Sequence, residues 1–145
     1  MLEKVKAFWR LTNNTGSYVA LQLDKDAFDF GEPLTGTVQI EGVDRALEGS
    51  VELTLFRRDR GRSEPTVTYD WVAIVEQTVI TPLTVAEGEK KALTFAIAPA
   101  AYSPYLAHYE PDGERGRLRL EARVSLRGAP DPRHAAEFRF TSAPA

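Results

Sequence analysis

Hydrophobic and polar residues alternate along most of the chain with a period of two. In the clearest segment, residues 118–126, apolar side chains occupy the even positions, and arginine, glutamate or serine occupies the odd positions between them. Successive side chains of a β-strand point to opposite faces, so this alternation predicts a strand with one dry face and one wet face. The same rule predicts strands over residues 34–41, 47–55, 93–97 and 136–140.

Three further segments are predicted as strands. Residues 67–75 alternate at first and become apolar on both faces from Trp71 to Val75, which predicts a strand covered on both sides. Residues 5–11 and 18–23 are the other two. The nine prolines are expected at element edges or in loops, where a missing amide proton does least harm. The longest stretch without alternation, residues 98–116, is where a short helix or an ordered loop is expected.

About eight or nine short strands separated by Gly, Pro and Asp clusters predict an all-β fold, an antiparallel two-sheet β-sandwich of the immunoglobulin-like kind. A single sheet leaves its apolar face in water at about 25 cal/mol per Å², whereas two facing sheets bury the apolar faces of all strands. At 145 residues the chain has the length of one domain, so we predict one sandwich over residues 1–145.

Composition and charge exclude several classes of protein. The chain has no cysteine, which excludes disulfide scaffolds, thiol nucleophiles and thiolate metal sites. A formal net charge of −3 gives no general attraction to nucleic acid, and no nucleic-acid partner is predicted. No apolar run reaches the length of about 20 residues that a membrane-spanning helix needs. Charges at Glu3, Lys4 and Lys6 interrupt the N-terminal segment, so we expect no secretion signal and a cytoplasmic location.

Arginines are concentrated at one predicted hairpin tip. Four of them lie close together in the sequence, at Arg57, Arg58, Arg60 and Arg62. Arginine binds carboxylate and phosphate oxygens through two parallel hydrogen bonds, so this cluster suits phosphate, an acidic peptide or lipid headgroups. The alternative is a charged turn with no ligand.

Tyrosines form the second candidate group, at Tyr102, Tyr105 and Tyr109 in the irregular segment. Tyrosines on a loop over a rigid sandwich build many binding surfaces, and here they would stack sugars or cover a peptide. The alternative is that they pack over an open end of the sandwich.

Signals for catalysis or metal binding are weak. His108, Glu110 and Asp112 have suitable donor atoms, but their spacing does not follow the rules for a metal site. No Gly-x-Ser-x-Gly segment supports a serine nucleophile. We therefore predict no catalytic residues, no metal and no cofactor.

Two stretches resemble arrestin-like domains. In the first, residues 25–42, Phe28 and Gly31-Glu32 precede a strand with Leu34, Gly36, Val38 and Ile40 at alternate positions. In the second, residues 82–104, an acidic glycine turn at Glu87-Gly88-Glu89 precedes the strand 93–97 and then Pro99 and Pro104. The pattern resembles in particular the bacterial sporulation-control proteins with an arrestin-like N-terminal domain. Phe30 stands where these families have proline, and the chain has length for one sandwich where they pair two.

The resemblance implies a non-catalytic protein-binding or scaffolding module. Such a module would recognise an unidentified protein partner through its loops or through an exposed sheet edge. A homodimer that covers the surface of the absent second sandwich is a further hypothesis. The alternatives from other classes are a carbohydrate-binding module that uses the loop tyrosines and a small hydrolase with two convergent titratable groups.

Overall fold

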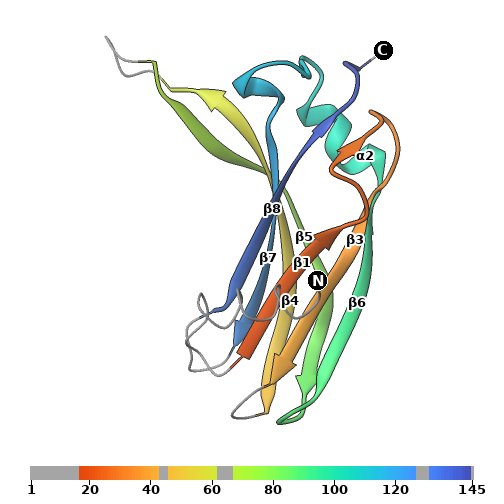
Figure 1. Ribbon diagram of the computed structural model, residues 1–145, viewed down its shortest axis with the longest axis vertical. Helices are drawn as coiled ribbons and strands as arrows, with labels where there is room; N and C mark the ends of the chain where they lie inside the picture. The colour runs from red at the N-terminus through yellow and green to blue at the C-terminus, as the bar shows by residue number, and fades with distance from the viewer. Residues whose placement is uncertain (1–16, 43–45, 62–66, 127–130, 145) are drawn as a thin grey trace.

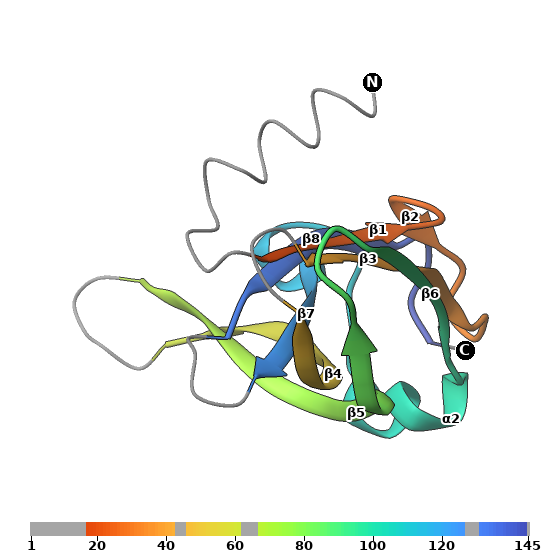
Figure 2. The same ribbon diagram turned by 90° about the horizontal axis from the view of Figure 1, so that it is seen from below.

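Two β-sheets face each other in the computed structural model of the chain (Figures 1 and 2). The structure describes residues 17–42, 46–61, 67–126 and 131–144. The smaller sheet has the order β1 (Ser17–Leu23), β3 (Leu34–Gly42), β6 (Lys90–Ile97). The larger sheet has the order β2 (Ala27–Phe28), β8 (Arg133–Phe140), β7 (Leu118–Leu126), β4 (Leu47–Arg60), β5 (Tyr69–Val85). The predicted two-sheet β-sandwich is confirmed.

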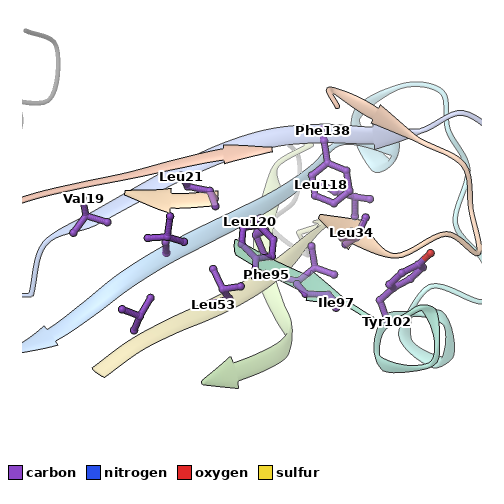
Figure 3. Close-up of a cluster of buried hydrophobic side chains, with 14 of the residues drawn as sticks. Val19, Leu21, Leu34, Leu53, Phe95, Ile97, Tyr102, Leu118, Leu120 and Phe138 are labelled. Carbon is purple, nitrogen blue, oxygen red and sulfur yellow. The ribbon is translucent and has the colours of Figure 1, made fainter. Parts of the chain in front are cut away.

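Alternation along the strands is the reason that the two sheets share one core. In β7, Leu118, Leu120, Ala122 and Val124 are fully buried, while Arg119 and the other residues between them are half-buried. In β3, buried and half-buried positions alternate along the whole strand. Side chains from both sheets form a single apolar cluster, to which the smaller sheet contributes Leu21 and Phe95 and the larger sheet Leu53 and Leu120 (Figure 3).

One pair of strands departs from the predicted antiparallel arrangement. β2 has only two residues and pairs in parallel with the end of β8. The amide of Thr141 donates to the carbonyl of Phe28, and the Phe28 ring packs edge-on against Phe138 at 5.7 Å between centroids. The pairing therefore anchors the chain between β1 and β3 to the larger sheet.

The expectation that residues 71–75 are covered on both sides is wrong. They lie in β5, the edge strand of the larger sheet, where Ala73 is exposed and its neighbours are half-buried. β5 has β4 on one side only, so one edge and much of its surface stay open. The prediction for prolines also fails here, since Pro82 lies inside β5. It has no partner in register on β4, and an edge strand tolerates that loss.

Residues 98–116 close one end of the sandwich. They contain the short helix α2 (Pro99–Tyr102) and two single 3-10 turns, η1 (Ser103–Tyr105) and η2 (Glu114–Gly116). The expected short helix or ordered loop is therefore present. Within the described ranges, none of the helical segments has the length and apolar character needed to cross a bilayer. The strand predicted over residues 5–11 lies outside the described residues.

Candidate binding site

A cleft of about 600 Å³ lies between the end of β4 and the segment that follows α2. The β4–β5 hairpin leaves the body of the sandwich there, as Figure 1 shows. We call it the hairpin cleft. It is lined by Arg57, Arg58, Asp59, Arg60, Pro104, Tyr105, Leu106, Ala107, His108, Tyr109, Glu110 and Arg115. The arginines and tyrosines that the sequence analysis singled out separately thus line one cleft.

Arg57 connects the two walls of the hairpin cleft. Its Nε donates to both carboxylate oxygens of Asp59 at 3.0 Å, and its Nη1 donates to the carbonyl oxygen of Tyr105 at 3.1 Å. Arg57 and Asp59 are two residues apart on β4, so both side chains point to the same face of the strand. The charge of Arg57 is therefore largely balanced within the wall.

Arg58 points to the opposite face of β4 and is held on that face. Its guanidinium carbon lies 4.7 Å from the centre of the Trp71 ring, and its Nε lies 3.4 Å from a carboxylate oxygen of Glu114. Arg117 also lies over Trp71, at 5.5 Å, and donates to the same carboxylate at 3.0 Å. Desolvation raises the pKa of Glu114, but the hydrogen bonds and charges of Arg117 and Arg58 outweigh it and lower that pKa below 4.5.

Arg60 and Arg115 are exposed at the cleft. Within the described part of the chain, neither guanidinium has an ion pair or a hydrogen bond to another side chain. These two arginines are therefore the cations of the cleft that are open to a ligand. Arg62, the fourth arginine of the predicted cluster, lies outside the described residues.

Tyr102 and Tyr109 do not belong to an exposed platform. Tyr102 is fully buried, and its hydroxyl donates to the carbonyl of Glu32 at 2.7 Å and accepts from the amide of Gly31 at 2.9 Å. Its ring lies in the core beside Leu34 and Ile97 (Figure 3). Burial raises the pKa of this hydroxyl more than the Gly31 amide lowers it. Tyr102 therefore packs into the core of the sandwich.

Tyr109 joins the irregular segment to β8 in the same way. Its hydroxyl donates to the carbonyl of Gly116 at 2.7 Å and accepts from the amide of Phe140 at 3.0 Å. Burial raises the pKa of this hydroxyl too. From the other side, Nη1 of Arg139 donates to the carbonyls of Pro111 and Gly113, both at 2.8 Å. These bonds hold residues 102–116 in one position against the larger sheet.

Tyr105 is the exposed member of the three tyrosines, with 52% of its surface open to solvent. It lines the cleft next to Pro104 and Ala107, which are also exposed. Arg115, which lines the cleft from the same segment, was not singled out from the sequence. No periodicity marks residues 98–116, so no sequence signal could have placed Arg115 beside the β4 arginines.

His108 and Glu110 line the cleft, but the described residues contain no group of three acidic or histidine side chains placed to hold a metal ion. The other histidine, His134, is on β8. Its Nδ1 accepts a hydrogen bond from the amide of Leu21 on β1 at 2.9 Å. Burial lowers the pKa of this imidazole below 6.5. His134 therefore joins the two sheets at a distance from the cleft.

Comparison with protein-family models matches residues 14–143 to the family Spo0M, described as SpoOM protein. The chain belongs to the Spo0M family. The fold agrees with this assignment and with the arrestin-like resemblance of residues 25–42 and 82–104. No curated protein sequence matches this Spo0M-family chain.

Solved structures show the same fold. The crystal structure of Spo0M, a sporulation control protein from Bacillus subtilis, matches with a TM-score of 0.73 and 20% identity. The match covers 86% of this chain and 49% of that one, so the chain spans about half the length of the Bacillus protein. A β-glucosidase from Listeria innocua in complex with gluconolactone matches with a TM-score of 0.51 and 17% identity. That match covers 89% of this chain and only 17% of the enzyme, and it shows a likeness of fold alone.

Proposed function

We propose that this Spo0M-family chain is a non-enzymatic regulatory module that binds a protein partner in the hairpin cleft. The observation that carries the proposal is the construction of the cleft, in which exposed arginines and an exposed tyrosine stand on walls that are held by hydrogen bonds, among them the buried bond of the Tyr109 hydroxyl. Binding groups on a rigid scaffold lose little conformational freedom when a partner arrives. The family's name and the sporulation-control description of the Bacillus protein support a regulatory role, which we place in the cytoplasm.

The chemistry of the cleft favours recognition over catalysis. Arginine keeps its charge at any physiological pH, so it binds anions well and transfers protons poorly. The carboxylate of Asp59 is occupied by two hydrogen bonds from Arg57. The carbohydrate alternative loses its basis, because Tyr102 and Tyr109 are buried and only Tyr105 of the three tyrosines is exposed for stacking.

Photo-crosslinking in living cells tests the proposal. The photoreactive residue p-benzoylphenylalanine is placed at Tyr105 in the cleft, at Ala73 on the β5 edge, or at Thr94 on the outer face of β6. All three positions are exposed, so the fold tolerates the larger side chain. We expect a discrete crosslinked protein from position 105, identified by mass spectrometry, and none from position 94.

The three positions distinguish the ways in which a partner can bind. Crosslinks from position 73 but not from position 105 would move the binding surface to the β5 edge, where an extended segment adds as one more strand. Equal crosslinks from positions 105 and 94 would show nonspecific contact and would overturn the proposal.

A further inference from the structure

We infer that the segment bound in the hairpin cleft is an acidic peptide whose carboxylates bind Arg60 and Arg115. This inference rests on the proposed function and names the chemical class of the partner.

Charge balance within the cleft is the first argument. Four arginines line it against two carboxylates, in a chain whose formal net charge is −3. Arg57 is balanced by Asp59, and Arg58 is paired with Glu114 outside the cleft. The arginines left without an ion pair are therefore Arg60 and Arg115, one from each wall, and Glu110 is the one carboxylate of the lining that remains beside them. Exposed guanidinium groups without an ion pair bind oxyanions, and a carboxylate accepts two parallel hydrogen bonds from one guanidinium.

The shape of the cleft indicates a peptide rather than a single small ion. Its volume of about 600 Å³ is within the range of sites that hold drug-sized ligands. Pro104, Tyr105 and Ala107 provide an exposed apolar surface beside the two arginines. A peptide that alternates acidic and apolar residues would use both surfaces, because apolar contacts supply affinity and ion pairs supply register.

Glu110 gives the inference a test of opposite sign. Its exposed carboxylate lines the same cleft and repels an acidic ligand. Removal of this charge should therefore strengthen binding, whereas removal of the arginine charges should weaken it.

The experiment measures fluorescence anisotropy of a labelled synthetic peptide that alternates glutamate with leucine, titrated with the full chain. We expect saturable binding that weakens as salt rises. The double variant Arg60→Gln/Arg115→Gln should bind about tenfold more weakly, and Glu110→Gln should bind about twofold more tightly. The matched control is Lys90→Gln/Arg133→Gln, which removes the same charge from exposed positions at the starts of β6 and β8, and it should change binding by less than about twofold.

Several outcomes would overturn the inference. They are equal weakening in both double variants, equal binding of the same peptide with glutamine in place of glutamate, and binding of anionic lipid vesicles without binding of the peptide. Thermal unfolding of each variant checks that the fold is kept. If crosslinks form at position 105 and the acidic peptide does not bind, the inference fails while the proposed function stands.

Discussion

Tyr109 shows how much of the cleft depends on one hydroxyl group. This hydroxyl donates to Gly116 and accepts from Phe140, so a single buried atom satisfies two backbone groups from distant parts of the chain. The ring packs edge-on against Phe140 at 5.4 Å between centroids. Ring and hydroxyl therefore contribute separately, and a substitution can remove one while it keeps the other.

We predict that Tyr109→Phe lowers the free energy of unfolding by about 2 kcal/mol, because it leaves a buried carbonyl and a buried amide without a partner. Urea denaturation measures the change. Tyr105→Phe is the control, since Tyr105 is exposed, and it should change stability by less than about 0.5 kcal/mol. Equal losses in the two variants would contradict the role of the Tyr109 hydroxyl.

At the scale of single residues, the sequence indicated which arginines lie close together but not which side chains they contact. It marked Arg57, Arg58 and Arg60 as a cluster, and they do line one cleft. It could not tell that Arg57 binds Asp59 while Arg58 lies over Trp71, because those partners depend on which face of β4 each residue occupies near the hairpin. The binding roles of Arg60 and Tyr105 stay predictions.

β3 lies at the centre of the smaller sheet and contains a glycine that its neighbours require. A Cβ atom at Gly36 would overlap the carbonyl oxygen of Gln22 on β1 and would lie 2.7 Å from Cζ of Phe95 on β6. The Phe95 ring thus occupies the space that a side chain at position 36 would fill.

We predict that Gly36→Ala destabilises the protein by about 2 kcal/mol, because β1 or the Phe95 ring must move to admit the methyl group. Thr37→Ala, the next position on the opposite face of β3, should cost less than about 0.5 kcal/mol. Thermal unfolding of both variants measures the difference. A neutral Gly36→Ala variant would show that this contact is not tight in solution.

Among the elements, most strands could be predicted, whereas the position of the irregular segment against the sandwich could not. Period-two alternation depends only on neighbouring residues, which is why β3 and β7 were predicted close to their observed bounds. β4 was predicted to end at residue 55 but continues to Arg60. The position of residues 99–116 depends on bonds from Tyr102, Tyr109 and Arg139 to backbone atoms far along the chain. β5 was misjudged because apolar composition does not say whether a strand is central or at an edge.

At the scale of the whole molecule, His134 provides a polar link between the two sheets. β1 has β3 on one side only, and on its other side the amide of Leu21 donates to Nδ1 of His134 on β8. This bond requires Nδ1 to be unprotonated. Burial favours the same neutral form and lowers the pKa of the imidazole below 6.5.

The lowered pKa predicts that stability falls in acid. The contribution of His134 to the free energy of unfolding is fully present at pH values above its ordinary pKa of 6.5. It is lost as the pH falls below that value, because the imidazole of the unfolded chain takes up a proton before that of the folded chain. The loss is at most about 1.4 kcal/mol per pH unit for one proton. Urea denaturation between about pH 7 and pH 5 should show a shallower decline for His134→Gln than for the wild type. The control is His108→Gln, which removes the exposed histidine of the cleft and should keep the wild-type decline of stability with falling pH. If all three proteins show the same dependence of stability on pH, the hydrogen bond of His134 is not its cause.

The chain spans about half the length of the Bacillus Spo0M chain. The homodimer expected from the sequence analysis stays a prediction, and sedimentation equilibrium at high micromolar concentration measures it directly.

The anchoring of residues 102–116 has a consequence for protein engineering. Its anchors are the buried side chains of Tyr102 and Tyr109 and the half-buried side chain of Arg139, which bind backbone atoms. Ala107 and His108 do project into solvent, at the cleft. A library of sequences at these two positions would leave the anchors intact, so new specificities can be selected on the cleft without redesign of the sandwich beneath it.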